Sequence, residues 1–352
     1  MTSMTISELE LYWVQIGCMG QQSPVWSLVV RLATDSGLEG WGEGQVVWRP
    51  AELGARRDFL LPVLAGRSAF DIEEFLTLEA LRLAPLRCAV EMALWDLVGR
   101  AARQPICHLL GGAYRQRVAL AVRLPAAPAQ QAAQVGRELA DKGFHTQIIA
   151  STGQLELDLE TVAAVREVAH ERAELRFDAA GNYDLDRARE LCTELEDQGL
   201  QFVLDPLREP KLDQIASLRR QTSVPLAVSR AIRSPADMLA VVRCGAAASV
   251  IVDLQSVGGI QTARKCAAIA EAAGIPASLG CGPSLGIAAA AALQLVASSP
   301  GLSNCHDYAC HQLQEDLLVE PLEIVDGMIA VPRGPGLGVE IDRAKVEHYQ
   351  VT

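Results

Sequence analysis

The sequence predicts a barrel of parallel β-strands joined by crossover helices, preceded by a smaller α+β domain. The first observation is a series of short apolar runs that begin 24 to 27 residues apart within residues 175–282. The second is helical periodicity in the segments between these runs, as in residues 186–198 and 234–244. Strands that alternate with helices in this way indicate parallel pairing, and enough such units close into a barrel.

Five apolar runs make up the regular part of the pattern. Each is too short for a helix and is flanked by turn residues, as buried strands are. The runs cover residues 175–178, 201–205, 225–230, 249–253 and 276–280. Polar side chains stand where four of them end: Asp178, Asp205, Arg230 and Asp253. Because parallel barrels gather their active sites at the carboxyl ends of the strands, we expect the chemistry there.

The first third of the chain lacks this spacing and predicts a separate α+β domain. Strand-like segments at 27–33 and 38–43 are joined by a turn. Helical patterns follow over residues 50–64, 70–81 and 86–101. A sheet followed by helices is typical of an α+β unit. The polar segments 17–23 and 48–50 are candidates for a lid.

The barrel pattern starts at Val118, with further strands expected at 118–122, 144–150 and, last, 304–309. Residues 323–331 predict another hairpin, which an irregular Gly/Pro segment follows. Residues 274–300 carry no charge, but Pro276, Gly280, Gly282 and Pro283 break the segment early. This pattern favours a buried strand and a small-residue helix over a membrane span.

Composition indicates an ordinary soluble globular protein. The 352 residues are 50% hydrophobic and 21% charged, with a net charge of −12 and a pI near 5.1. This acidity argues against nucleic acid and anionic membranes as partners. The nine cysteines are scattered through apolar segments, as buried thiols of a cytoplasmic protein are, and we see no signal peptide.

Sequence blocks along nearly the whole chain match one family together. They are Gly-Trp-Gly-Glu at 40–43; Ala-Val-Glu-Met-Ala-Leu-Trp-Asp at 89–96, with Gln-Pro at 104–105 and Leu-Leu-Gly-Gly at 109–112; 257–263; and 331–339. The sequence thus resembles the mandelate racemase and muconate lactonizing enzyme branch of the enolase superfamily. The resemblance implies a (β/α)7β TIM-type barrel over residues 116–317. It also implies an N-terminal α+β capping domain over 1–115, completed by the C-terminal tail 318–352.

The resemblance further implies abstraction of a proton alpha to a carboxylate, with a Mg²⁺ ion on three carboxylates stabilising the enediolate. Asp178 matches the first metal ligand. Leu204 stands at the second position, and Ser229 or Arg230 at the third. Because Mg²⁺ needs several hard oxygen ligands, we expect the metal site to be lost and predict no cofactor.

The family's acid and base groups are also replaced. Its Lys-x-Lys on the second barrel strand falls within residues 147–150, which contain no lysine. Asp253 stands where family members have an Asp or a Lys, and Gly280 stands at the position of a His. Asp307 corresponds to a further family carboxylate on the last strand. Asp253 and Asp307 are therefore the candidate catalytic residues, unless Asp253 only binds backbone at its strand end.

Other polar groups are candidates for ligand binding. Arg230 either replaces the metal, facing Asp178 or an anionic ligand, or only neutralises Asp178. Ser151 ends the second barrel strand, Arg49 lies on the candidate lid, and His306 is placed with Asp307 at the mouth. Cys281 is either a nucleophile or a buried thiol. The Cys-His pairs at 305–306 and 310–311 lack CxxC spacing, which disfavours zinc.

Two functional hypotheses follow. The first is a divergent family member that binds a small carboxylate or other anion at the barrel mouth without Mg²⁺. It either transfers protons without a metal or has lost catalysis. The alternative is a conventional Mg²⁺-dependent racemase, dehydratase or cycloisomerase. A purely structural role, with the mouth closed by side chains, also stays open. The resemblance implies a homo-oligomer.

Overall fold

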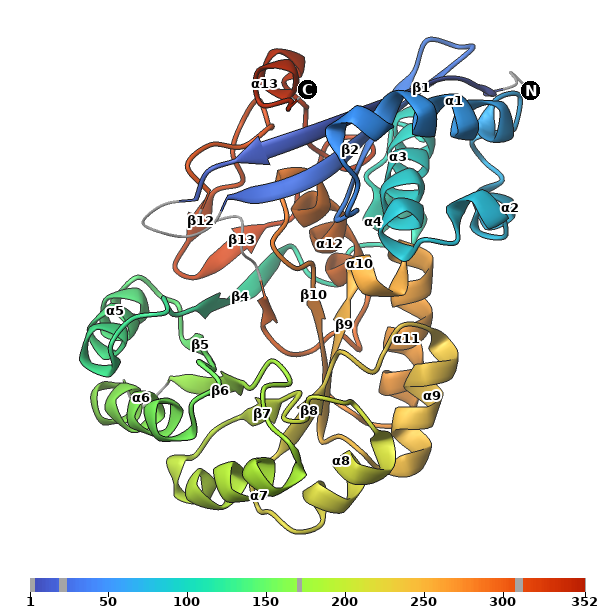
Figure 1. The fold of residues 1–352 in the computed structure, drawn as a ribbon. Helices are drawn as coiled ribbons and strands as arrows, with labels where there is room; N and C mark the ends of the chain where they lie inside the picture. The colour runs from blue at the N-terminus through green and yellow to red at the C-terminus, as the bar shows by residue number, and fades with distance from the viewer. Residues whose placement is uncertain (1–3, 19–23, 170–172, 308–312, 352) are drawn as a thin grey trace.

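Eight parallel strands close into a barrel that forms the lower part of the molecule in Figure 1. The computed structural model describes residues 4–18, 24–169, 173–307 and 313–351. The barrel strands, in order, are β4 (Arg117–Arg123), β5 (Thr146–Ala150), β6 (Glu174–Asp178), β7 (Phe202–Leu204), β8 (Leu226–Val228), β9 (Ser249–Asp253), β10 (Ala277–Gly280) and β11 (His306–Asp307). Each strand pairs with the next along the chain, and β11 pairs back with β4.

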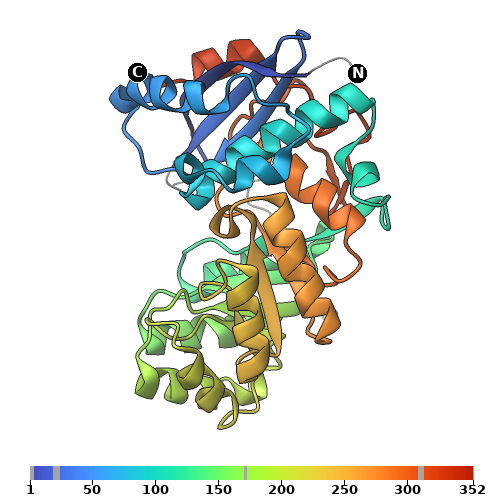
Figure 2. The ribbon, with the colours of Figure 1, turned by 90° about the vertical axis from the view of Figure 1, so that its right-hand side faces the viewer.

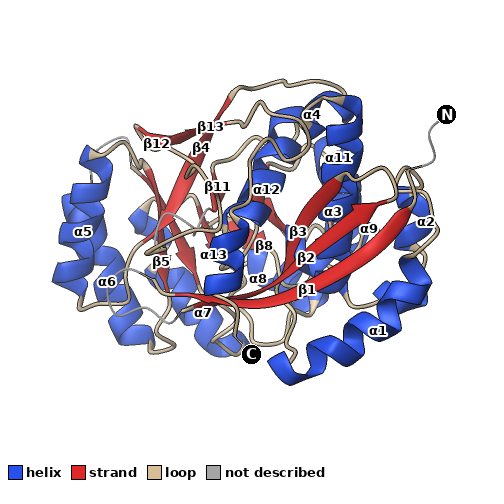
Figure 3. Cartoon of the chain, turned by 90° about the horizontal axis from the view of Figure 1, so that it is seen from above, coloured by secondary structure: helices blue, strands red, loops and turns tan. Residues whose placement is uncertain are grey.

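A helix follows each of the first seven barrel strands. These helices are α5 (Ala129–Asp141), α6 (Leu155–Val168), α7 (Leu185–Glu194), α8 (Leu212–Arg219), α9 (Pro235–Cys244), the pair α10 (Leu254–Val257) and α11 (Ile260–Ala272), and α12 (Gly286–Ser298). They surround the strands in the view of Figure 3. The predicted (β/α)7β barrel is confirmed. Of the expected last strand, residues 308 and 309 lie outside the described residues.

The N-terminal domain packs an antiparallel sheet against helices on top of the barrel (Figure 2). Its strands are β1 (Ile6–Ile16), β2 (Val25–Thr34) and β3 (Glu39–Gly44). Its helical elements are η1 (Pro50–Glu52), α1 (Leu53–Leu64), α2 (Ile72–Leu76), η2 (Glu79–Leu81), α3 (Ala84–Ala102) and α4 (Ile106–Leu109). The sequence predicts β2, β3 and most of the helices, but it does not reveal β1.

The glycines of β3 let the long helix α3 lie directly on the sheet. A Cβ atom at Gly40, Gly42 or Gly44 would come within 2.3 Å of a backbone oxygen of α3 or its first turn. Because side chains alternate along a strand, Trp41 and Glu43 then point to the opposite face of the sheet. The alternation of glycine with large residues therefore gives β3 one face of glycines, which contacts α3, and an opposite face that carries Trp41 and Glu43.

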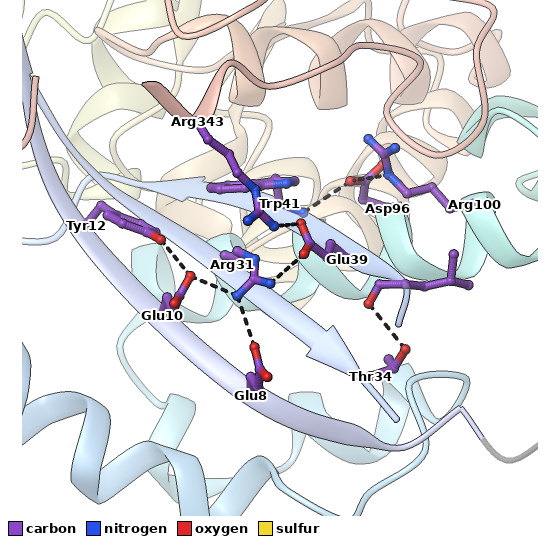
Figure 4. A network of polar contacts seen from close by, with 11 residues as sticks. Glu8, Glu10, Tyr12, Arg31, Thr34, Glu39, Trp41, Asp96, Arg100 and Arg343 are labelled. Carbon is purple, nitrogen blue, oxygen red and sulfur yellow. Dashed lines mark hydrogen bonds and ion pairs between the residues drawn. The ribbon is translucent and has the colours of Figure 1, made fainter. Parts of the chain in front are cut away.

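The C-terminal tail returns to both domains. The hairpin of β12 (Ile324–Val325) and β13 (Met328–Ala330) pairs with the barrel through β13 and β4, in antiparallel register. Helix α13 (Arg343–His348) lies over the cap sheet (Figure 1). Figure 4 shows the contact that holds it there: Arg343 donates to Glu39 and lies over the ring of Trp41.

A single arginine connects the three strands of the cap sheet beneath α13 (Figure 4). Arg31 on β2 donates to Glu8 and Glu10 of β1 at 3.2 and 2.8 Å, and to Glu39 of β3 at 2.5 Å. The Arg31 side chain is only 8% exposed and that of Glu39 is 30% exposed, so the pair with Glu39 is screened less than surface pairs are. The carboxylates compensate the buried guanidinium and align the three strands.

Buried carboxylates of the cap bind backbone N–H groups at the starts of two barrel helices. Glu43 accepts hydrogen bonds from the N–H groups of Leu285 and Ala288 at 2.7 and 2.9 Å, at the start of α12. Glu91 on α3 accepts one from Gln261 at 2.8 Å, in the first turn of α11. Helix N-termini attract negative charge and carry unpaired N–H groups, so both contacts are favourable.

The close approach at Glu91 explains the glycine pair at 258–259. Gly259 has a φ of +123°, and a Cβ atom there would collide with the carboxylate of Glu91. Gly258 has a φ of +86°, and Arg87 of α3 donates to its carbonyl group at 3.3 Å. This glycine pair is thus required for packing the cap on the barrel.

None of the helices within the described residues is long and apolar enough to cross a membrane. Residues 274–300, which raised this question in the sequence, form β10 and the buried helix α12.

The Glu91 contact predicts a pH-dependent stability. Burial raises the pKa of Glu91 to about 7 although Gln261 and Trp95 donate to it. Between the ordinary carboxyl pKa and pH 7, the folded state therefore keeps a proton on Glu91 that the unfolded state has released. The free energy of unfolding thus falls as the pH rises from 5 to 8. Over that range, we expect the difference in unfolding free energy between wild type and Glu91→Gln to fall by about 2 kcal/mol. Urea unfolding at several pH values measures it, and an unchanged difference contradicts the assignment.

Candidate functional site

The carboxyl ends of the barrel strands and the loops that follow them form the barrel mouth, where an arginine bridges two carboxylates. Arg123 is the last residue of β4. Its Nη1 donates to Oδ2 of Asp178 on β6 at 2.8 Å. Its Nε and Nη2 donate to Oδ2 of Asp307 on β11 at 3.1 and 2.9 Å. The bridge therefore joins the first, third and eighth strands of the barrel.

This bridge fixes one positive charge in the mouth. Burial lowers the pKa of Arg123, but Asp307 and Asp178 more than offset it, so the pKa is raised above its ordinary value. The second oxygen of Asp178 accepts the N–H of Ala180 at 2.9 Å. From the sequence, Asp178 is expected to have an arginine partner, and the candidate is Arg230. The structure gives Asp178 an arginine partner, and it is Arg123.

The positions that the resemblance assigns to Mg²⁺ do not offer a suitable ligand set. Asp178 is paired with Arg123. Leu204 is its register partner on β7 and is buried in an apolar cluster with Phe202, Ala227 and Ile251 inside the barrel. A leucine supplies no oxygen, and Mg²⁺ takes an octahedron of hard oxygen ligands. Within the described ranges, no group of three or more His, Cys, Asp or Glu side chains is placed to hold a metal ion.

Asp205 supports the neighbouring loop instead of replacing the missing ligand at Leu204. Its carboxylate accepts the backbone N–H groups of Ser229 and Arg230 at 3.0 and 3.1 Å. Burial raises its pKa to about 6. The residue has a φ of +46°, in the left-handed region that few non-glycine residues adopt and in which aspartate is enriched. The alternation of side chains along β7 explains why Asp205 points to the loop after β8.

Arg230 lies at the end of β8 with its guanidinium over the loop that follows β6. Its Nη1 donates to the carbonyl oxygens of Ala180 and Leu207 at 3.4 and 3.5 Å. Gly181 lies under the guanidinium and has no room for a Cβ atom. Arg230 is exposed and forms no ion pair with a carboxylate of the described residues. Its charge therefore stays available at the rim of the mouth.

Asp253 binds the start of α10 and lies beside the loop after β10. Its Oδ1 accepts the N–H of Ser256 at 2.7 Å and thereby caps α10. Its Oδ2 lies beside Gly280 and Gly282, where a Cβ atom would be 3.7 and 3.9 Å away. Burial raises the pKa of Asp253, and the charge of Asp307 raises it further. The structure thus gives Asp253 the backbone contact and, in addition, a hydrogen bond from the hydroxyl group of Ser256.

Ser151 belongs to a closed hydrogen-bond network at the end of β5. Its Oγ donates to Asp158 at 2.5 Å and accepts from the backbone of Gly153 and the side chain of Asn182 at 2.9 and 3.1 Å. The hydroxyl of Tyr183 also donates to Asp158. These partners of Ser151 all belong to the protein. Ser151 therefore stabilises the loops after β5 and β6 in this structure.

Two further candidates lie in the barrel wall. His306 is buried, and its Nδ1 lies 2.8 Å from the N–H of Leu279 and accepts its hydrogen bond. Burial lowers the pKa of His306 to about 3, so the ring is neutral. Because Asp307 points to the barrel interior, the alternation of the strand turns His306 away from it. Cys281 is buried beside Ser284, whose hydroxyl lies 3.2 Å from Sγ.

The cap segment with Arg49 borders the barrel. Arg49 is exposed and precedes η1. Nearby, the N–H of Gln45 donates to Gln255 at 3.2 Å, and the side chain of Gln45 donates to the carbonyl of Pro283. The segment is thus anchored to the loops after β9 and β10. Of the other predicted lid segment, residues 19–23 lie outside the described residues, as do Cys310 and His311 of the zinc alternative.

Sequence reasoning missed Arg123, the residue that organises the mouth. A signal was present in the sequence. Arg123 directly follows the apolar run 118–122, just as Asp178 stands at the end of the run 175–178. Only the closure of the barrel through β11 and β4 shows that this arginine reaches both Asp178 and Asp307.

The environment of Cys281 predicts an unreactive thiol. Burial raises its pKa to about 12, and the thiolate is the reactive form. We expect iodoacetamide at pH 8 to label the exposed Cys244 in the native protein and to leave Cys281 unlabelled until the chain is denatured. Peptide mapping by mass spectrometry measures both sites. Labelling of native Cys281 at the rate of Cys244 would show that its thiol is accessible and ionised.

Comparisons with known proteins agree with this architecture. The family model described as enolase C-terminal domain-like matches residues 130–345. The model of the mandelate racemase / muconate lactonizing enzyme N-terminal domain matches residues 8–111. Together they cover the cap and the barrel from α5 onward.

Similar proteins extend over the whole chain. Muconate cycloisomerase 1 from Rhodococcus opacus is 29% identical over 336 residues, covering 92% of this chain and 90% of that protein. The N-succinyl-L-Arg/Lys racemase of Bacillus cereus is 23% identical and covers 99% of this chain and 98% of that protein. The structure of 2-chloromuconate cycloisomerase from Rhodococcus opacus 1CP matches with a TM-score of 0.92 at 25% identity, over 100% of each chain. The resemblance seen in the sequence is thereby confirmed, and the chain belongs to the mandelate racemase / muconate lactonizing enzyme family of the enolase superfamily.

Proposed function

We propose that this protein binds a small carboxylate or other anion at the barrel mouth without Mg²⁺, and that it is an isomerase-like enzyme acting by metal-independent proton transfer. The observation that carries the proposal is the exposed guanidinium of Arg230, held by carbonyl groups at the rim of the mouth. Relatives named as cycloisomerases and a racemase support the isomerase class.

A second arginine supports the anion site. Arg208 follows β7, is exposed, and donates through Nη2 to the carbonyl oxygen of Asn182 at 3.2 Å. Arg230 binds the same loop through Ala180. Neither arginine has a carboxylate partner among the described residues, so both retain donors for a ligand. Guanidinium groups bind carboxylates through paired, charge-assisted hydrogen bonds, which suits this ligand class.

Asp253 is the proposed acid and base. An isomerisation by this route moves a proton from a carbon next to the ligand's carboxylate onto Asp253 and returns it to the ligand, so no atom is gained or lost. Burial raises the pKa of Asp253, which favours a group that accepts and releases a proton. Asp307 is less suited because it is paired with Arg123. Arg230 then stabilises the negative charge that develops on the ligand.

Anion binding is tested by thermal unfolding with a panel of mono- and dicarboxylates, each compared with NaCl at equal ionic strength. We expect at least one carboxylate to raise the melting temperature by roughly 2 °C at ten times its Kd. Arg230→Gln should weaken its binding at least tenfold. Arg243→Gln is the matched control, because Arg243 is exposed at the end of α9, away from the mouth. Equal loss in both variants, or no stabilising anion, overturns the proposal.

Proton transfer is tested by NMR in D₂O with a carboxylate that binds. Wild type should exchange the proton alpha to the carboxylate for deuterium in the presence of EDTA. Asp253→Asn should slow the exchange at least a hundredfold and leave the melting-temperature shift unchanged, because Arg230 is intact. Binding without exchange in wild type identifies a non-catalytic anion-binding descendant. Exchange that requires Mg²⁺ identifies the conventional metal-dependent isomerase and overturns the metal-free mechanism.

A further inference from the structure

We propose that the guanidinium of Arg123 is the resident cation of the barrel mouth and takes the position of the divalent ion. We further propose that a divalent cation binds there once Arg123 loses its charge and Leu204 becomes a carboxylate. This inference deepens the proposed function and depends on its metal-free site. It also differs from the sequence hypothesis, which gave the role of the cation to Arg230.

The geometry of Arg123 is that of a central cation with carboxylates around it. Its three guanidinium nitrogens donate to Asp178 and Asp307 at 2.8 to 3.1 Å. The three residues come from the ends of β4, β6 and β11, and all three side chains point into the barrel. Asp178 and Asp307 are 13% and 18% exposed, so two partly buried negative charges would repel each other without it.

The charge of the site supports the replacement. Arg123 with Asp178 and Asp307 leaves a net charge of −1. A divalent ion among Asp178, Asp307 and a carboxylate at position 204 would leave the same net charge. A carboxylate at position 204 would add an uncompensated charge beside Arg123 and Asp178. The apolar Leu204 avoids this excess, so the arginine and the leucine are matched to each other.

Leu204 is the position from which a third ligand would reach the same centre. It is the register partner of Asp178 on the adjacent strand and lies inside the barrel, next to Ala227 and Ile251. A glutamate there would extend from the end of β7 toward the carboxylate of Asp178. With Arg123 in place, we expect such a glutamate to pair with the guanidinium.

The test compares Mn²⁺ binding, measured by EPR, in wild type, Arg123→Gln, Leu204→Glu and the double variant Arg123→Gln/Leu204→Glu. We expect no stoichiometric binding in wild type or Leu204→Glu. The double variant should bind one Mn²⁺ at least tenfold more tightly than Leu204→Glu. In Leu204→Glu the new carboxylate pairs with Arg123, whereas in the double variant it is free to bind the metal, so the two substitutions are not additive. In Arg123→Lys/Leu204→Glu, the retained positive charge should again exclude Mn²⁺. This control separates the charge of Arg123 from its size.

Each outcome decides the proposal, once thermal unfolding shows that the variants are folded. Binding by Leu204→Glu as tight as that of the double variant shows that Arg123 does not occupy the cation position. A folded double variant without Mn²⁺ affinity overturns the proposal and leaves the anion function intact. Stoichiometric binding by wild type overturns both.

If the double variant does not fold, the single variant Arg123→Gln decides. It should bind Mn²⁺ weakly, and Arg123→Gln/Asp178→Asn should not bind it. Equal Mn²⁺ affinity of these two variants overturns the proposal.

Discussion

The whole arrangement depends on buried carboxylates that join the cap to the barrel. Glu43 and Glu91 bind the first turns of α12 and α11, and Asp96 accepts the N–H of Leu337 in the tail. All three side chains are buried and isolated from water. Burying a carboxylate is costly unless hydrogen bonds compensate it. Helix N-termini provide them for Glu43 and Glu91, whereas Asp96 pairs with Arg100 and accepts the N–H groups of Trp41 and Leu337. The requirement for these donors fixes where the cap sits over the barrel.

The chemistry of the mouth follows from where charge is kept and where it is compensated. Arg123 is neutralised by two carboxylates, whereas Arg230 is held only by carbonyl groups. The first arrangement is suited to structure within the barrel, and the second leaves a positive charge at the rim for the anion that we propose. Two arginines a few loops apart thus have different roles because of their acceptors.

The fold could be predicted from the sequence because the strand spacing and the family blocks are local patterns. Several of those blocks serve packing: the glycine pair at 258–259 fits beneath Arg87 and Glu91, and the glycines of β3 fit against α3. The strand β1 was missed although Leu9, Leu11 and Trp13 are buried in alternation with Glu8, Glu10 and Tyr12. The two glutamates of this strand are explained by Arg31 on the neighbouring strand. The mouth was less predictable. The partner of Asp178 depends on barrel closure, and the direction of Arg230 depends on a loop in which Ala180 has a φ of +52°.

The return of the tail to both domains has a consequence for how the chain folds during synthesis. The first barrel strand is paired with β13 at residues 328–330, and the cap sheet is covered by Arg343 of α13. The strand β4 and the cap sheet therefore gain these contacts only from residues that are synthesised more than two hundred positions later. Domains usually fold in order as they leave the ribosome, but this cap has to wait with part of its sheet uncovered. Until residues 328–343 are released, β4 and the cap sheet therefore lack these partners.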